Sequence, residues 1–534
     1  MTATLQILLS LVAALIVVAV LARRLNIAPS ILLVIAGVGL ALIPGLPPIV
    51  LAPEFVLLVI LPPLIYSAGV AMSWREFKFN LRPIILLAFG AVVFTTCAVA
   101  AGAHYVLGLP WAVGFVLGAI VAPPDVVAPL AIARRLGLPH RLLVVLEGEG
   151  LANDATALIL YRFAVAAVAT GAFSLPEAAG SFAAIVVCEI AYGIGVGWVS
   201  LRLRRWAHDP RVEITLSLIT PYVAYWVPEH FGGSGVLATI AAGLYISWNG
   251  PLLISSATRL QGIFFWDLIV YLIEGLVFLL TGLQARTLID RAQDLSAYDI
   301  LVATLLTTAI IIAARFIWLF PAIYLPRWLS PSLRARDPSP PWQWSFILAF
   351  TGVRGVVSLA AALAIPFELE NGAPFPYRDP MLFVSFGVII ITLVGQGLML
   401  PSVIRWLGVA NAGKEERFHE RAAEFAARRE TAQRALERLE ELAVERHLSQ
   451  ELLEISRTRH NNRLKLLPES LDNVRDAVEQ AQLRVELIDV ERKYLHQLLR
   501  DGKISDESRR RIERELDLEE VGINTRSGNG DAPL

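Results

Sequence analysis

An apolar segment at residues 117–125 reads Leu-Gly-Ala-Ile-Val-Ala-Pro-Pro-Asp. Proline cannot donate a helical hydrogen bond, so Pro123-Pro124 should interrupt a helix here and free backbone carbonyl groups. A second apolar segment is interrupted in a comparable way, because Gly352 and Gly355 flank Arg354. If both segments lie in a bilayer, Asp125 and Arg354 are candidate functional residues, since a charge kept at mid-membrane is costly.

The composition around these segments is that of a membrane protein. The chain has 534 residues, of which 56% are hydrophobic, and a mean hydropathy of +0.60, which excludes an ordinary soluble protein. Its 46 basic and 47 acidic residues leave no basic surplus for a nucleic-acid partner. The two cysteines, Cys97 and Cys188, lie in apolar runs, so we expect neither a disulfide framework nor a zinc site.

Thirteen apolar stretches of membrane-spanning length are bounded by Pro, Gly or charged residues. They are residues 4–22, 29–46, 54–72, 83–107, 111–133, 142–170, 177–201, 212–228, 232–248, 263–283, 300–325, 343–366 and 380–403. The sequence therefore predicts an all-α integral membrane protein with thirteen transmembrane helices over residues 1–410.

Basic residues alternate between the loops that connect these stretches. Loops after odd-numbered stretches carry sixteen Arg or Lys residues, whereas loops after even-numbered stretches carry only Arg286, Arg291 and Arg378. Cytoplasmic loops are the basic ones. The N-terminus is therefore predicted outside the cell membrane (the inner membrane of a bacterium), and the C-terminal tail in the cytoplasm.

Thirteen spans divide naturally into two six-helix units, spans 1–6 and 8–13, separated by one linking helix. Units of opposite orientation are inverted repeats, which are typical of secondary transporters. In this arrangement the interrupted spans 5 and 12 correspond to each other. Matched interruptions of this kind indicate a substrate site near the middle of the membrane.

Span 6 carries three acidic residues, Glu147, Glu149 and Asp154. Glu149 and Asn153 share a helix face, and Asp154 is rotated about 100° from Asn153. Asp154 could exchange a proton for a metal ion. It could instead be a carboxylate paired in the core, for which Arg354 is the obvious cation, although Glu149 would compete for the same cation.

A small alkali cation prefers hard oxygen ligands. Asp125, Asp154, the Asn153 amide and the carbonyl groups freed at Pro123 and Pro124 would supply them. Glu147, Glu274 and Arg315 are further intramembrane charges that could support such a site.

These motifs resemble the sodium/proton exchangers of the monovalent cation:proton antiporter superfamily, first branch, and in particular the bacterial electroneutral antiporters. The resemblance covers the first 410 residues. It rests on residues 117–125, on residues 147–155 (Glu-Gly-Glu-Gly-Leu-Ala-Asn-Asp-Ala), on residues 352–355 (Gly-Val-Arg-Gly) and on residues 61–64 (Leu-Pro-Pro-Leu).

The resemblance implies an inverted-repeat fold with crossed, discontinuous helices at spans 5 and 12. It also implies a homodimer, a mobile core domain, alternating access and a part in pH regulation. The Asn153-Asp154 pair then marks electroneutral exchange, with Asp154 binding either Na⁺ or H⁺, and Glu149 forms a structural ion pair with Arg354. The family is a transporter rather than an enzyme, and we expect no cofactor.

Three positions depart from the family pattern. Residues 124–126 read Pro-Asp-Val where Thr-Asp-Pro is common, Gly150 stands where serine is frequent, and residues 65–67 (Ile-Tyr-Ser) lack an acidic residue. K⁺ or Li⁺ is therefore a possible transported ion beside Na⁺. A non-transporting membrane ion sensor that acts through the tail is the alternative from another class.

The tail differs sharply from the membrane part, because residues 411–534 hold 23 basic and 27 acidic residues. Without an apolar run of spanning length it cannot cross a membrane. We expect a cytosolic, charged helical domain at residues 411–521, folded as a helical hairpin or bundle. Its first helical stretch runs from Lys414 to about Leu467, and Pro468 divides it from a second stretch at about 470–500 and a third near 504–520. Residues 522–534 are expected to be disordered.

Overall fold

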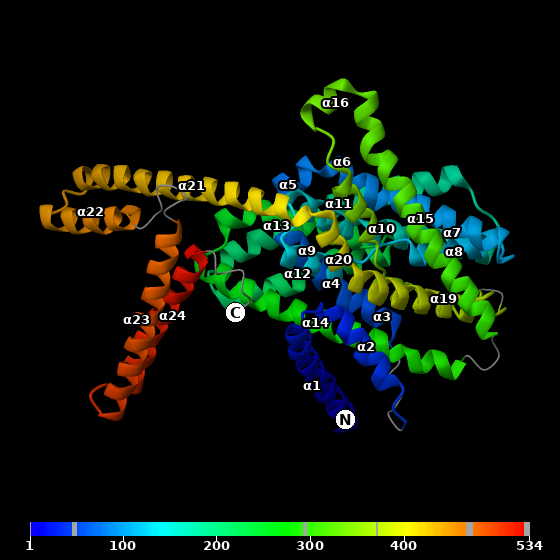
Figure 1. The fold of residues 1–534 in the computed structure, drawn as a ribbon, viewed down its shortest axis with the longest axis horizontal. Helices are drawn as coiled ribbons and strands as arrows, with labels where there is room; N and C mark the ends of the chain where they lie inside the picture. Colours follow the sequence, from blue (N-terminus) through cyan, green and yellow to red (C-terminus); the bar gives the residue numbers. More distant parts are fainter. Residues whose placement is uncertain (1, 45–50, 292–295, 370–371, 466–473, 528–534) are drawn as a thin grey trace. The chain divides into compact units, whose positions relative to one another are not determined.

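The computed structural model describes residues 2–44, 51–291, 296–369, 372–465 and 474–527 (Figure 1). Within these ranges the chain is helical, and the one extended pairing is an isolated bridge between Glu368 and Pro374. Two compact units, Met1–Gly413 and Lys414–Leu534, divide the chain.

In the described chain, each of the thirteen predicted stretches contains at least one helix. In the first unit they are α1 (Thr2–Leu25), α2 (Pro29–Ala41), α3 (Pro53–Phe55), the π-helical turn η1 (Val56–Ile60), α4 (Leu61–Ala71), α5 (Trp74–Phe79), α6 (Leu81–Ile85), the π-helical turn η2 (Leu86–Ala91), α7 (Val92–Tyr105), α8 (Trp111–Val121), α9 (Val127–Leu136), α10 (His140–Thr170), α11 (Leu175–Ala207), α12 (Pro210–His230), α13 (Val236–Leu253), α14 (Ser256–Arg291), α15 (Ala297–Leu329), α16 (Pro331–Arg336), α17 (Trp342–Phe350), α18 (Val356–Leu363), α19 (Arg378–Ile390), the π-helical turn η4 (Ile391–Gln396) and α20 (Gly397–Leu407). Among the described residues, eight helical stretches are long and apolar enough to cross a membrane, and α2 and α8 are shorter apolar helices. The expectation of an all-helical, membrane-type fold is confirmed.

Both interruptions predicted from the sequence are present. Helix α8 ends at Val121 and α9 begins at Val127, on either side of the two prolines. Helix α17 ends at Phe350 and α18 begins at Val356, on either side of the Gly-Val-Arg-Gly motif. Both breaks place polar backbone groups inside the helical bundle, where such groups need partners.

Glycines allow the long helices to approach closely. Gly37 on α2 faces α14, and a Cβ atom there would lie 2.3 Å from the Leu279 carbonyl oxygen. Gly282 on α14 faces back, and its Cβ would lie 2.3 Å from the Val34 carbonyl oxygen. Membrane helices are held together by such backbone contact, because lipid supplies no hydrophobic driving force between them.

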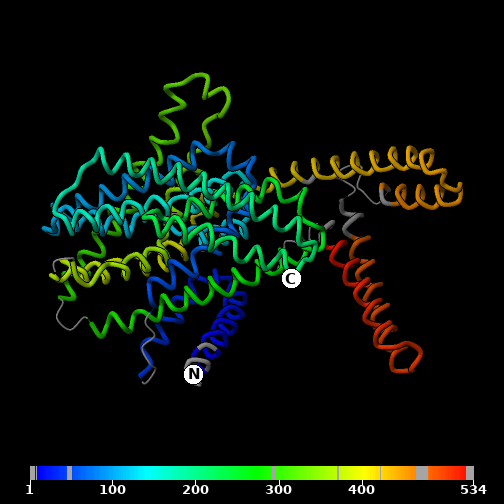
Figure 2. The backbone as a smooth tube through the Cα atoms, turned by 180° about the vertical axis from the view of Figure 1, so that it is seen from behind, coloured from blue at the N-terminus to red at the C-terminus, as the bar shows by residue number. Residues whose placement is uncertain are grey.

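The second unit contains two helical hairpins, whose backbones Figure 2 traces in orange and red. They are α21 (Val409–Glu445), which begins in the first unit, with α22 (Gln450–Lys465), and α23 (Val474–Arg500) with α24 (Asp506–Ser527). Arg457 joins α22 to Glu440 of α21 through an ion pair. Arg484 of α23 binds Glu519 of α24, with Nε to Oε1 at 2.8 Å.

The first helical stretch expected in the tail holds two helices in the described chain, α21 and α22, because the chain turns between Glu445 and Gln450, where His447 has a positive φ of 50°. Disorder does not begin at residue 522, because α24 continues to Ser527. Buried Ile523 packs in a cluster with Ile488 and Leu516, which offsets the cost of about 1 kcal/mol for a glycine inside a helix. Pro468 and residues 528–534 lie outside the described residues.

Candidate ion-binding site

The two helix breaks meet at Asp125. Its backbone N–H donates to the Val353 carbonyl oxygen at 2.7 Å, and its Oδ1 accepts from the N–H of Val127 at 2.9 Å, at the start of α9. Its other carboxylate oxygen fills the space beside Gly355, where a Cβ atom would lie only 1.6 Å from Asp125 Oδ2. The glycine is therefore required by the close approach of Asp125, and the site joins segments that are more than 200 residues apart in sequence.

Asn153 connects α10 to the first break. It is fully buried, and its Nδ2 donates to the Pro124 carbonyl oxygen at 2.6 Å. That carbonyl, which the sequence suggested as a cation ligand, therefore already accepts one hydrogen bond. The Asn153 Oδ1 atom is also buried and has no hydrogen-bond partner in the described chain, so it is an oxygen available to a ligand.

Asp154 is the partly accessible carboxylate beside this arrangement. Within the described residues its side chain has neither a hydrogen bond nor an ion pair, and the residue is half-buried. Its charge interacts with that of Asp125, which in turn interacts with Glu274 on α14. The site thus gathers the negative charges of α10, α14 and the first helix break, and no basic side chain among the described residues binds Asp154.

Glu149 forms a buried ion pair, but with Arg315 rather than with Arg354. Both side chains are at most 4% exposed. Arg315 binds the Glu149 carboxylate in a bidentate manner, with Nη1 to Oε1 at 2.5 Å and Nη2 to Oε2 at 2.8 Å. Its Nε donates to the Leu348 carbonyl oxygen at 3.0 Å. All three nitrogen atoms of the guanidinium group are therefore used. The expected Glu149–Arg354 pair is wrong because Arg315 occupies the carboxylate.

Gly352 explains how Arg315 reaches that position. A Cβ atom at residue 352 would lie 2.6 Å from Arg315 Cδ, so the arginine stem passes across the glycine. Arg354 is held by its backbone instead, with its N–H donating to Thr392 Oγ1 at 3.0 Å. Its Nε and Nη1 atoms are buried without partners among the described residues, and its charge interacts with both Arg315 and Glu149 at longer range.

The remaining acidic candidates lie outside the buried ion pair. Glu147 forms an ion pair with Arg134 of α9, and its side chain is 23% exposed, so it lies outside the buried pair. The Glu274 side chain has no hydrogen bond or ion pair among the described residues, and its negative charge is repelled by that of Asp125. Arg315 is more than the supporting residue that the sequence indicates, because it is the partner of Glu149. Its position in the middle of an apolar span is the feature of the sequence that marks it.

Two departures from the family motif are in contact. A Cβ atom at Gly150 would lie 2.2 Å from Cγ2 of Val126. Val126 therefore fills the space that a side chain at residue 150 would occupy, which accounts physically for a glycine at that position.

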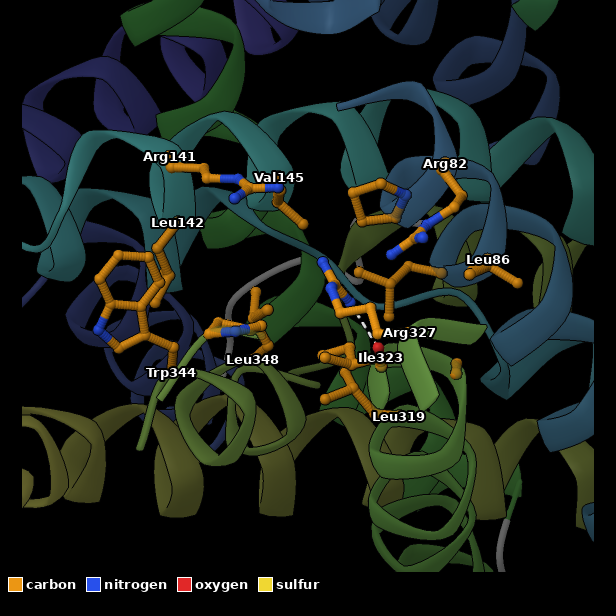
Figure 3. Close-up of a pocket in the computed structure, with 14 residues that line it drawn as sticks. Arg82, Leu86, Arg141, Leu142, Val145, Leu319, Ile323, Arg327, Trp344 and Leu348 are labelled. Carbon is orange, nitrogen blue, oxygen red and sulfur yellow. Dashed lines mark hydrogen bonds between the residues drawn. The ribbon is translucent and has the colours of Figure 1, made fainter. Parts of the chain in front are cut away.

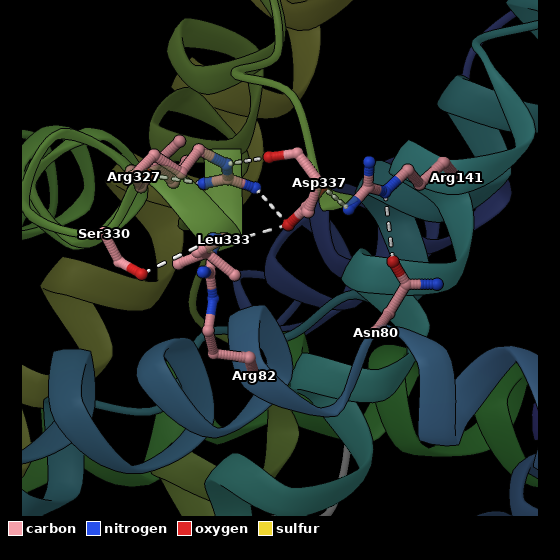
Figure 4. Close-up of polar contacts among 8 residues, drawn as sticks. Asn80, Arg82, Arg141, Arg327, Ser330, Leu333 and Asp337 are labelled. Carbon is pink, nitrogen blue, oxygen red and sulfur yellow. Dashed lines mark hydrogen bonds and ion pairs between the residues drawn. The ribbon is translucent and has the colours of Figure 1, made fainter. Parts of the chain in front are cut away.

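A second polar cluster lies away from the breaks and was not foreseen. Asp337, between α16 and α17, accepts from Arg141 Nη2 at 2.7 Å, from Arg327 Nη2 at 2.7 Å and from Arg82 Nη2 at 3.4 Å (Figure 4). Arg141 Nε also donates to Asn80 Oδ1 at 3.1 Å. Burial alone would raise the pKa of Asp337, but the hydrogen bond from Arg141 and the three arginine charges outweigh it and hold the pKa below its usual range.

A helical membrane protein with two interrupted helices that meet at carboxylate and amide groups has the architecture of a secondary transporter. The family model described as "Sodium/hydrogen exchanger, transmembrane" matches residues 10–406. The chain belongs to this family of sodium/proton exchangers, which are transporters rather than enzymes.

Relatives match over nearly the whole chain. An uncharacterised Na⁺/H⁺ exchanger of Mycobacterium tuberculosis is 34% identical over 97% of this chain and 96% of its own length. The Na⁺/H⁺ antiporter ApNhaP of Aphanothece halophytica is 31% identical over 89% of each chain. Among solved structures, the sodium proton antiporter MjNhaP1 of Methanocaldococcus jannaschii aligns with a TM-score of 0.58 at 18% identity, over 77% of this chain and 98% of that one, which supports the fold.

Proposed function

We propose that the chain exchanges a monovalent cation, with Na⁺ as the expected ion, for a proton at Asp154. The observation that carries this proposal is that Asp154 is half-buried beside the meeting point of the two breaks and has no fixed partner within the described residues. Glu149 and Glu147, by contrast, are each held by an arginine. A carboxylate that must bind and release an ion cannot already be neutralised by a permanent cation.

The ligands near Asp154 suit an alkali cation. Its carboxylate, the Oδ2 atom of Asp125 and the partnerless Oδ1 of Asn153 are hard oxygen donors. The carbonyl groups of Pro123 and Pro124 complete the candidate set, although the Pro124 carbonyl also accepts from Asn153. Either a cation or a proton would relieve the repulsion between Asp154 and Asp125, so the two ions compete for one site.

Competition at one carboxylate gives electroneutral exchange. The loaded site carries the same charge with Na⁺ as with H⁺, and movement only when loaded couples the two fluxes. For the membrane arrangement we propose thirteen spans in two inverted repeats, an outside N-terminus, a cytoplasmic tail and a homodimer. The alternation of basic loops supports the orientation; the dimer rests on family resemblance.

Potassium or lithium transport by the same residues is the nearest alternative. A relative from Bacillus pumilus, 33% identical over 68% of this chain, is named a sodium, potassium, lithium and rubidium/H⁺ antiporter. A membrane ion sensor that acts through the helical tail is the other alternative, and it would bind the ion without net transport.

Proteoliposomes with an imposed pH gradient test these proposals. Addition of Na⁺, K⁺ or Li⁺ should dissipate the gradient, and Asp154→Asn should abolish this response. Asp267→Asn is the matched control, because Asp267 is an exposed residue of α14 and should retain exchange. Unchanged exchange in Asp154→Asn would exclude the proposed site, whereas cation binding without exchange in the wild type would favour the sensor. A strong dependence of exchange on membrane voltage would contradict electroneutrality.

A further inference from the structure

A pocket of about 50 Å³ lies beside the Asp337 cluster, at the ends of α6, α10, α15 and α17 (Figure 3). Its walls are of two kinds. Three of the fourteen lining residues are the arginines Arg82, Arg141 and Arg327, and the other eleven are apolar. The arginines belong to the basic loops that the proposed topology places in the cytoplasm.

The three arginines that line the pocket carry more positive charge than Asp337, the one acid that they bind in the described chain, neutralises. Asp337 provides one negative charge for three guanidinium groups, and its lowered pKa keeps it ionised at neutral pH. The cluster therefore has a net charge of about +2. Figure 3 shows the three arginine side chains converging above the apolar residues Leu319, Trp344 and Leu348.

Arg82 has hydrogen-bonding capacity that the protein does not use. Its Nε and Nη1 atoms are buried and have no partner among the described residues. A buried donor without an acceptor costs about 1 to 3 kcal/mol. The side chains of Arg82 and Arg141 are nevertheless each 31% exposed overall, and both line the pocket.

We propose that this pocket binds the phosphate group of an anionic phospholipid from the membrane leaflet on the basic-loop side. The phosphate would accept from Arg82, since guanidinium groups match phosphate geometry. The glycerol and the first acyl carbons would cover the apolar wall formed by Leu86, Val145 and Ile323. Basic pockets between transmembrane helices on the cytoplasmic side are suited to acidic lipid headgroups.

The apolar wall favours a lipid over a free anion. A soluble phosphate would satisfy Arg82 but leave most of the lining in contact with water. A lipid satisfies both kinds of wall at once, and its phosphate lies at the depth where the transmembrane helices end. The inference concerns lipid binding and does not depend on which cation the transporter carries.

Lipid titration of the full-length protein, purified in a neutral detergent, tests the proposal. Native mass spectrometry would count bound phosphatidylglycerol, with phosphatidylcholine and inorganic phosphate as comparison ligands. Arg82→Gln should weaken phosphatidylglycerol binding roughly fivefold. Arg334→Gln is the matched control, because Arg334 is exposed on α16 and does not line the pocket; it should leave binding within about twofold of the wild type, because its charge lies outside the pocket.

A second variant tests the space in the pocket while leaving its charge unchanged. Ala322 lines the cavity, and Ala322→Leu should fill it and abolish binding while all three arginines remain. The proposal is overturned if Arg82→Gln behaves like Arg334→Gln, if phosphatidylcholine binds as tightly as phosphatidylglycerol, or if inorganic phosphate binds equally well. Should Arg82→Gln fail to fold, undiminished binding by Ala322→Leu would overturn it alone.

Discussion

Removal of Arg315 is expected to be among the most damaging single changes in the membrane unit. Arg315→Gln would leave Glu149, which is fully buried, without its two hydrogen bonds of 2.5 and 2.8 Å. Loss of one partner of a buried ion pair costs about 3 to 5 kcal/mol, because the other charge remains uncompensated. The Leu348 carbonyl oxygen would lose its donor as well.

A double-mutant cycle separates this pair from its competitor. Glu149→Gln and Arg315→Gln, alone and combined, should give a coupling free energy of about 2 kcal/mol or more, since directly bonded residues are not additive. The parallel cycle of Glu149→Gln with Arg354→Gln should give less than about 1 kcal/mol, because those side chains interact through charge without a bond within the described residues.

Reversible denaturant unfolding in mixed micelles would provide the free energies, with proton-coupled cation flux recorded for each variant that folds. The reasoning is refuted if the Glu149–Arg354 coupling equals or exceeds the Glu149–Arg315 coupling. It is also refuted if Arg315→Gln unfolds at the wild-type denaturant concentration.

Three further changes probe the site and its surroundings. Gly355→Ala should displace Asp125, reduce transport at least about tenfold and cost about 1 to 3 kcal/mol in unfolding free energy through overpacking. Gly39→Ala is the control, because no atom lies within 4 Å of the new Cβ, and it should transport normally. Equal flux in the two variants would contradict the close approach of Asp125 to Gly355. Asn153→Ala should raise the apparent KM for the cation. It should also cost about 1 to 3 kcal/mol in unfolding free energy, because the Pro124 carbonyl loses its donor. An unchanged KM would show that Asn153 is not a ligand of the cation. Asp337→Asn should lower the free energy of unfolding by about 2 kcal/mol at pH 7. Because the pKa of Asp337 is lowered in the folded state, this loss should be complete above the ordinary carboxyl pKa and should vanish as the pH falls through the lowered pKa. A loss that grew in acid would contradict this prediction.

The sequence predicted those features that depend on local chemistry. Pro123-Pro124 and the glycines of residues 352–355 act on the backbone where they stand, so both helix breaks could be placed before the structure. The apolar stretches likewise lie where the helices are. The exact number of spans and the inverted repeat remain predictions, since eight helical stretches of the described chain are long and apolar enough to cross a membrane.

Features that depend on tertiary packing could not be predicted in this way. Glu149 had two possible buried arginine partners, and the choice of Arg315 depends on how α15 passes Gly352. The Asp337 cluster brings together arginines of α6, α10 and α15, which are distant from one another in sequence. In the tail, the turn near His447 has neither proline nor glycine to mark it, and the helix through Gly522 is stabilised by the burial of Ile523.

The acidic residues of the membrane unit differ in the groups that bind their carboxylates. Glu149 is fixed by Arg315 and Glu147 by Arg134, while buried Glu189 accepts the backbone N–H groups of Gly235 and Leu237 at the start of α13. Each of these interactions fixes structure because its partner is permanent. Asp154 differs in being half-buried and unpartnered in the described chain, next to the charge of Asp125. An ion carrier needs such a residue, because only a charge that the fold leaves uncompensated can be neutralised by one ion on one side of the membrane and by another on the opposite side.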